Sequence, residues 1–140
     1  MTEETTGPAP EVQEAPPQNM KKAVAVALVT WLLPGMGHIV LRRWGRGLIF
    51  LGVVGTLAIT GFLLRGNIFS AHGDDIFEFL GYLADLGSGI FFFFAKSIEK
   101  AGPDVSRAAG DYGTRFIATA GVVNALCILD AFEIARGRKG

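Results

Sequence analysis

The first informative feature of this chain is the stretch WLLPGMGHIVLRRWGRG, residues 31–47, which separates two long apolar runs. Half of the 140 residues are hydrophobic and the mean hydropathy is +0.39, yet this stretch holds a Pro-Gly pair, a histidine and three arginines. It could be a nucleotide-binding loop, a catalytic corner or the point where a membrane chain turns. The residue types favour the turn.

Gly35-Met-Gly37 does not form a dinucleotide-binding fingerprint. That motif needs a third glycine, a preceding strand and a βαβ unit, and the sequence has none of these; it also lacks a GK[ST] phosphate loop. Nucleotide binding is therefore not expected.

A membrane turn explains each residue type in the stretch. Pro34 removes a backbone donor and kinks a helix, while Gly35 and Gly37 permit unusual backbone angles. Backbone groups freed at membrane depth must find partners in protein or water, which is easier near the interface. His38 is expected to be an interfacial hydrogen-bonding residue, with a proton carrier or metal ligand as the alternative. Arginines can lie among lipid head groups. The turn and interface signature comprises Pro34, Gly35, Gly37, His38, Arg42, Arg43, Arg46 and Gly47.

Four apolar runs predict transmembrane helices over residues 23–41, 47–64, 76–96 and 114–134. A helix over the first run would reach about 28 Å, close to the hydrocarbon thickness of roughly 30 Å. Basic residues and a tryptophan at the borders of the runs are typical of a membrane interface. The expected fold is therefore all-α, an integral membrane bundle of four transmembrane helices.

Two of these runs have an alternative. The first could be the apolar core of a cleaved signal peptide with a cleavage site at Gly35-Met-Gly37, but the apolar run continues and a second one follows at once. The third contains Asp85 at its centre, which costs about 2.5–3.5 kcal/mol on insertion scales. A re-entrant or surface helix is the alternative for that run.

The charged residues are unevenly distributed. Residues 1–20 carry four Glu and four Pro and predict a disordered acidic tail ahead of the membrane domain, residues 21–140. No Asp or Glu occurs between Met20 and Gly73, and the formal net charge is zero. This pattern is not the basic face that a nucleic-acid partner requires. The single cysteine, Cys127, excludes an intramolecular disulfide and is expected to be a small core residue.

Charge counting does not orient a chain of four spans. One side would hold six Lys and Arg: Lys21, Lys22, Arg65, Arg136, Arg138 and Lys139. The other would hold seven: Arg42, Arg43, Arg46, Lys96, Lys100, Arg107 and Arg115. The positive-inside rule cannot choose between these sums, so the orientation stays open.

Small and polar residues predict how the last two spans pack. Helical spacing places Gly81, Asp85, Ser88 and Gly89 on one face of the third span, and Gly121, Asn124 and Ala125 on one face of the fourth. Asp85 and Asn124 would both lie about 14–16 Å from the same border. We expect these spans to pack antiparallel with the two polar side chains close together. A proton or cation site at Asp85 is the functional alternative.

The quoted stretch, extended to WLLPGMGHIVLRRWGRGLIF, resembles the Pro-Gly-x-Gly-His…Arg-Gly signature of an uncharacterised family of small bacterial multi-pass membrane proteins, akin to the two-transmembrane-helix domain proteins. The resemblance extends to LADLGSGIFFFFAK, residues 83–96, and to DYGTRFIATAGVVNALCILDAFEIARGRK, residues 111–139. One departure is HIVLRRW, where an aromatic-Leu-Gly sequence is expected. The resemblance implies a multi-pass protein of the bacterial inner membrane and implies no activity.

No catalytic constellation is visible in the sequence. The two histidines and the cysteine lie far apart along the chain, so an enzyme, a cofactor and a metal site are not expected. His72, Asp74 and Asp75 are expected to form a polar loop between helices, with metal binding as the alternative. Asp130 and Glu133 are expected to be solvated at the end of the fourth span.

Two classes of function remain. The first is an accessory or scaffold protein that acts in the lipid bilayer through helix–helix association, with a membrane-protein partner or as a homo-oligomer. The second is a minimal oligomeric ion or small-solute transporter or channel that uses Asp85.

Overall fold

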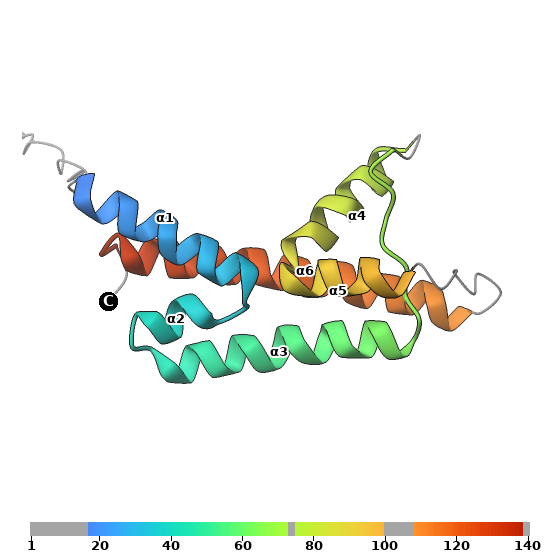
Figure 1. Cartoon of the computed structure of the whole chain (residues 1–140), viewed down its shortest axis with the longest axis horizontal. Helices are drawn as coiled ribbons and strands as arrows, with labels where there is room; N and C mark the ends of the chain where they lie inside the picture. Colours follow the sequence, from blue (N-terminus) through green and yellow to red (C-terminus); the bar gives the residue numbers. More distant parts are fainter. Residues whose placement is uncertain (1–16, 73–74, 100–107, 139–140) are drawn as a thin grey trace, which may run out of the picture.

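The computed structural model describes residues 17–72, 75–99 and 108–138, and every regular element in these ranges is an α-helix (Figure 1). The prediction of an all-α chain is thus confirmed for the described residues. Most of the predicted disordered tail lies outside them, although residues 17–20 are already helical. The helices are α1 (Pro17–Leu32), α2 (Met36–Val40), α3 (Trp44–Leu63), α4 (Ile76–Gly87), α5 (Ile90–Glu99) and α6 (Ala108–Ala135).

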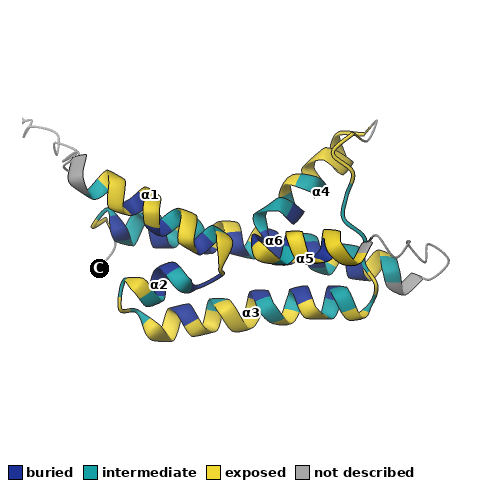
Figure 2. Ribbon diagram, viewed as in Figure 1, coloured by how far each residue is buried: buried dark blue, intermediate teal, exposed yellow. Residues whose placement is uncertain are grey.

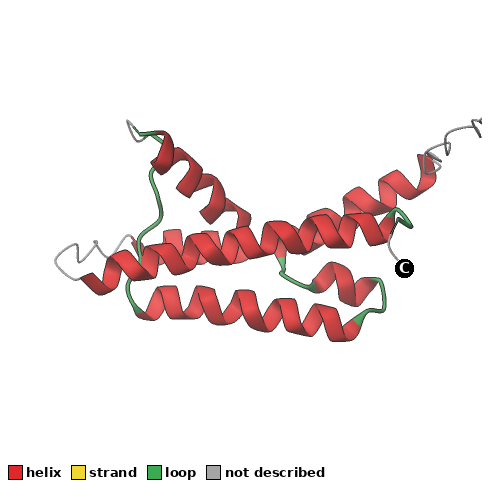
Figure 3. Ribbon diagram, turned by 180° about the vertical axis from the view of Figure 1, so that it is seen from behind, coloured by secondary structure: helices red, strands yellow, loops and turns green. Residues whose placement is uncertain are grey.

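The two longest helices, α3 and α6, run antiparallel and lie side by side (Figures 1 and 3), and α6 also packs against α1 and α4. Within the described residues, Trp44–Leu63 and Gly110–Ala135 are the single helices long and apolar enough to cross a membrane. The bent pair α4 and α5 adds a third span if it is counted as one broken helix. The structure therefore gives two or three candidate spans, where the sequence predicted four.

The first apolar run, residues 23–41, is not one helix. Helix α1 ends at Leu32, and the short helix α2 folds back along it. The two helices are so close that a Cβ at Gly37 would clash with the Thr30 side chain. Pro34 disfavours helical backbone at the residue before it, and Gly35 adopts the left-handed conformation with φ +81°. The predicted turn is thus placed inside the predicted span, and it produces a helical hairpin.

The third apolar run, residues 76–96, is also broken. The chain bends by 115° between α4 and α5, with Ser88 and Gly89 at the break. Gly89 has φ +64°, a conformation that glycine adopts without steric strain. Its Cα lies against the carbonyl of Trp31, so an added Cβ would collide with the end of α1. The break in this run therefore coincides with the place where α1 stops.

Asn124 of α6 joins the two helix ends that meet at this place. Its amide nitrogen donates hydrogen bonds to the carbonyl of Trp31 at the end of α1 (3.2 Å) and to the carbonyl of Gly87 at the end of α4 (2.8 Å). The indole N–H of Trp31 donates to the carbonyl of Leu86 (3.0 Å). The last carbonyls of a helix have no partner within the helix. These side chains supply one instead.

Helices α4 and α6 pack closely, but not through all of the residues that were predicted for their small faces. Gly87 and Gly121 bring the two backbones into close contact, and Gly121 lies against the carbonyl of Ala84. Ala125, which was expected on the same face, is exposed. Gly81 instead contacts the ring of Phe69 in the segment before α4.

Asp85 and Asn124 are both buried, but the hydrogen bonds that the structure gives them have different partners. The Asp85 carboxylate accepts a hydrogen bond from the backbone N–H of Phe69 (2.8 Å), and the Asn124 amide nitrogen donates to the helix ends described above. Asp85 therefore fixes the segment between α3 and α4 against α4.

The burial pattern is inverted relative to that of a soluble domain (Figure 2). Small residues, mainly alanine and glycine, fill most of the interior, together with the fully buried polar residues Thr30, His38, Asp85, Ser88 and Asn124. Large apolar side chains cover the outside, for example Leu63, Ile49, Leu126 and Leu129. Small residues allow helix backbones to approach closely, which is how helices pack in lipid.

Replacing Asn124 by alanine is expected to destabilise the fold by about 1–3 kcal/mol, because two helix-end carbonyls lose their donor. Unfolding in mixed detergent micelles, followed by far-UV circular dichroism, measures the change. Val122→Ala, at an exposed position on the same helix, serves as the control. Equal stability of the two variants would contradict the role of Asn124.

Candidate functional site in the cleft between α3 and α6

The most elaborate polar contact in the described residues surrounds His38. This side chain is fully buried on α2, and its Nε2 lies 3.0 Å from Oδ2 of Asp130 on α6. Its Nδ1 lies 3.7 Å from Sγ of Cys127, which is also fully buried. Cys127 and Asp130 are three residues apart and so share one face of α6. The imidazole is therefore held from both ring nitrogens by one helix.

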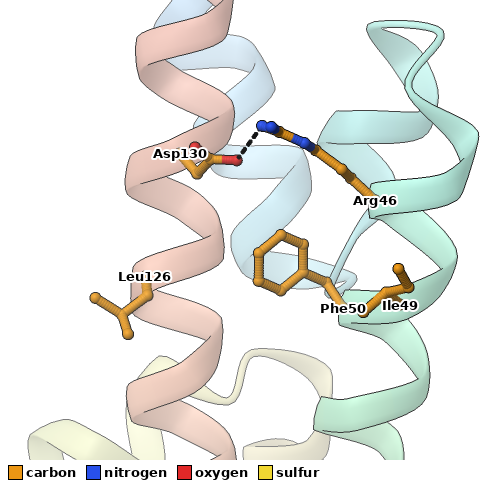
Figure 4. Close-up of a pocket in the computed structure, with 5 residues that line it drawn as sticks. All are labelled: Arg46, Ile49, Phe50, Leu126 and Asp130. Atoms are coloured by element: carbon orange, nitrogen blue, oxygen red, sulfur yellow. Dashed lines mark hydrogen bonds and ion pairs between the residues drawn. The ribbon is translucent and has the colours of Figure 1, made fainter. Parts of the chain in front are cut away.

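Arg46 completes this cluster from the first turn of α3. Its Nη1 lies 3.4 Å from the same Oδ2 of Asp130 (Figure 4). The Arg46 side chain is 51 % exposed and that of Asp130 is 21 % exposed, whereas His38 is enclosed. The carboxylate thus lies at the boundary between the interior and the surface. It was expected to be solvated, and it instead links three helices.

An open cleft of about 530 Å³ lies beside the cluster, between α3 and α6. One end is charged and the remainder is apolar (Figure 4). The lining residues are Arg46, Ile49, Phe50, Leu126 and Asp130. The ring of Phe50 also packs against the His38 imidazole, with 5.1 Å between the ring centroids. The cleft and the buried histidine therefore belong to one structural unit, although His38 does not line the cleft.

The Pro-Gly-x-Gly-His signature builds this unit through close backbone contacts. Gly35 lies against the carbonyl of Gly47 and the backbone nitrogen of Leu51, and Gly47 lies against the side chain of Ile39. A Cβ at Gly35 or Gly47 would clash with these atoms. The glycines thus let α2 lie on the first turns of α3, which aims His38 at α6. Pro34 is buried in the turn.

Of the three arginines in the signature, only Arg46 lines the cleft. Arg42 and Arg43 lie in the link between α2 and α3, where Arg42 is exposed and adopts a left-handed conformation with φ 61°. Both lie at the same end of the bundle as the cluster.

The order Cys127, His38, Asp130 resembles the nucleophile, base and orienting group of a hydrolytic triad. The Cys127 thiol is fully buried, however, and does not line the cleft. This geometry positions the imidazole and does not present a nucleophile to a substrate in the cleft. No group of three His, Cys, Asp or Glu within the described ranges is placed to hold a metal ion.

Both His38 and Arg46 belong to the predicted turn and interface signature, but the sequence does not connect them to Asp130. The residues are 92 and 84 positions apart, and no spacing rule relates them. One signal was available: an ionisable residue in the last two turns of an apolar helix is expensive unless it has a partner. His38, whose side chain can be neutral or protonated, was a candidate for that partner.

A double-mutant cycle on His38→Ala and Asp130→Ala is expected to give a coupling of about 1–3 kcal/mol, because each side chain keeps the other hydrogen-bonded in the interior. The measurement is detergent unfolding of both single variants and the double variant. A second cycle on His38→Ala and Thr119→Ala, an exposed residue toward the other end of α6, should show no coupling. Additive effects in the first cycle would show that the contact does not contribute to stability.

A family model matches most of the chain, but the comparisons with known proteins show no activity. Residues 25–140 match the family of unknown function DUF6677, and this range includes every residue of the His38 cluster and of the cleft. Neither the curated proteins nor the solved structures contain a match to the chain. Because the match covers most of the sequence, the chain belongs to DUF6677, a family of unknown function.

Proposed function

We propose that this protein is a multi-pass protein of the cell membrane, specifically the bacterial inner membrane, in which α3 and α6 are the full spans. The observation that supports this is the inverted burial pattern, with large apolar side chains outside and small or polar ones inside. The α1–α2 hairpin enters the bilayer and returns to the side from which it started. The bent pair α4 and α5 enters from the opposite side, and the two broken elements meet at Asn124.

This topology distributes the basic residues between the two membrane sides differently from a topology of four spans. The start of α1, the end of α2 and the end of α6 cluster together: Ala23 packs with Ala131, and Leu41 packs against the same group. From the helices that carry or flank them, the described Lys and Arg at this end are Lys21, Lys22, Arg42, Arg43, Arg46, Arg136 and Arg138. The described Lys and Arg at the other end are Arg65, Lys96 and Arg115. The positive-inside rule then favours the cytoplasm for the end that holds the start of α1 and the end of α6.

Cysteine labelling tests this topology, in a Cys127→Ala background. We expect a cysteine at position 72 to react with a membrane-impermeant maleimide in intact cells. Cysteines at positions 42 and 138 should react only after permeabilisation. Four spans would instead put positions 72 and 138 on one side and position 42 on the other. Labelling in that pattern would contradict the hairpin.

Within this topology, the protein acts as an accessory or scaffold component through helix–helix association, and the outer face of α3 is the contact surface. Gly45, Gly52 and Thr56 form a stripe of small residues on this face, all exposed. Nothing lies within 4 Å of the position that a Cβ on Gly45 or Gly52 would occupy. Leu48 and Ile59 flank the stripe and are also exposed.

The occupant of this face is a second copy of the chain. A groove of small residues bordered by apolar ridges is self-complementary across a two-fold axis, because the ridges of each copy fit the groove of the other. Packing of this kind needs no charged residue, and the stripe has none. The resulting homo-oligomer is the form in which we expect the protein to serve as a scaffold.

Cross-linking in native membranes tests the pairing. With Cys127→Ala as the background, Gly52→Cys is expected to give a cross-linked dimer with a short bifunctional maleimide, because the stripes of two copies face each other. Ala125→Cys, at an exposed position on α6, is the matched control and should remain monomeric. A monomeric Gly52→Cys variant, labelled fully by a monofunctional reagent, would exclude pairing through this face.

A second candidate, a minimal transporter, is favoured by one observation: broken helices meet inside the bundle, as in many transporters. Asp85 would not be its ion-carrying group, because its carboxylate holds the segment before α4. The His38–Asp130 pair would serve instead. Proton flux into proteoliposomes distinguishes the candidates: a flux that Asp130→Asn abolishes supports transport, and absence of flux supports the scaffold.

A further inference from the structure

The cleft between α3 and α6 changes in polarity along its length. Arg46 lies in the first turn of α3, and Ile49 and Phe50 follow one turn deeper into the helix. On α6, Asp130 lies about one turn from the helix end at Ala135, and Leu126 lies one turn deeper. Each turn advances about 5.4 Å. The cleft is therefore charged at the end of the spans and apolar toward their middle.

This order is that of a phospholipid from head group to acyl chain. A molecule lying in the cleft with its polar part between Arg46 and Asp130 would place its hydrocarbon against Ile49 and Leu126. Both apolar side chains are more than half exposed in the structure (67 % and 60 %), so they offer surface for such contacts. The charged end of the cleft lies at the border that a head group occupies, provided that α3 and α6 cross the membrane.

The charged end carries one cation and one anion. The Arg46 guanidinium has five N–H donors in a planar fork that matches phosphate oxygens. Its Nη1 lies 3.4 Å from Oδ2 of Asp130, and half of the side chain is exposed. The Asp130 carboxylate is partly exposed at the same position, where an ammonium group can donate to it. An anionic ligand would meet attraction from one group and repulsion from the other.

We propose that the cleft binds a zwitterionic phospholipid whose head group carries a phosphate and a primary ammonium, of the phosphatidylethanolamine type. The phosphate binds Arg46 and the ammonium binds Asp130, so both charges at the cleft are complemented. His38 acts as a positioning residue, because it holds the carboxylate from the buried side. The acyl chain packs along the apolar lining. This site depends on the membrane location and is independent of the pairing of two copies through α3.

Native mass spectrometry of the full-length protein in mild detergent tests the site. The probes are phosphatidylethanolamine, phosphatidylcholine and phosphatidylglycerol with identical acyl chains. Phosphatidylcholine has no N–H to donate, and phosphatidylglycerol has no cation. We expect phosphatidylethanolamine to be retained with roughly tenfold higher affinity than either, the effect of one charge-assisted hydrogen bond. Equal retention of the three lipids, or strongest retention of phosphatidylglycerol, would overturn the proposal.

Arg46→Gln is expected to reduce the retention of phosphatidylethanolamine to the level of phosphatidylcholine. Arginine and glutamine have similar helix propensities and the side chain is half exposed, so the fold should persist. Arg42→Gln is the matched control, since Arg42 is exposed at the same end but does not line the cleft. Equal losses in both variants would indicate general attraction to basic residues and would also overturn the site.

Soluble phosphoethanolamine separates head-group binding from lipid binding. When phosphoethanolamine is added at the same concentration as the lipid, it should not displace bound phosphatidylethanolamine, because it lacks the hydrocarbon that contacts Ile49 and Leu126. Displacement would show that the occupant is a free phosphate compound and not a lipid. Cross-linking at position 52 is a separate measurement, so a failure of the lipid site leaves the test of the scaffold proposal intact.

Discussion

Hydrogen bonding of helix ends inside an apolar bundle is the constraint on which this structure depends. Helices α1 and α4 both end against α6 at part-buried positions, and their last carbonyls have no partner within their own helices. Asn124 donates to one carbonyl from each helix, and Trp31 donates to a third. A single amide on a continuous helix thus permits two interruptions of the chain. Without it, the carbonyls of Trp31 and Gly87 would lose this donor.

The same interruption that needs Asn124 also creates the His38 cluster. Because Pro34 and Gly35 reverse the chain, α2 lies between α1, α3 and α6 and not in line with α1. His38 then faces Asp130 and Cys127 on α6, and Arg46 reaches the same carboxylate from α3. Backbone geometry in the turn, and not a local motif of polar residues, therefore assembles the polar site beside the cleft.

The polar side chains of the bundle fall into two groups, those that hold helices together and those that lie at the cleft. Asp85 and Asn124 bind backbone groups and hold elements in place. The Arg46–Asp130 pair, in contrast, lies at a cleft with partly exposed side chains. Charged groups that are held in position yet accessible are better suited to bind a ligand than groups whose hydrogen bonds hold the helices together. The scaffold proposal uses a different surface, the outer face of α3, where small residues are left uncovered.

Composition and local residue rules were sufficient to predict an all-α chain, the long apolar helices α3 and α6 and a turn at Pro34–Gly35, because propensity, length and backbone restrictions act over a few residues. They also predicted the close packing of Gly121, which depends only on the absence of a side chain. They did not predict that α2 doubles back, that the third run breaks at Gly89, or that Asp130 is paired. Each of these depends on a tertiary contact: Gly37 packs on α1, Gly89 lies against Trp31, and Asp130 pairs with His38. A proline or glycine marks where a helix can end, but the direction of the next helix is set by the surface on which it packs, and that surface exists only in the folded chain.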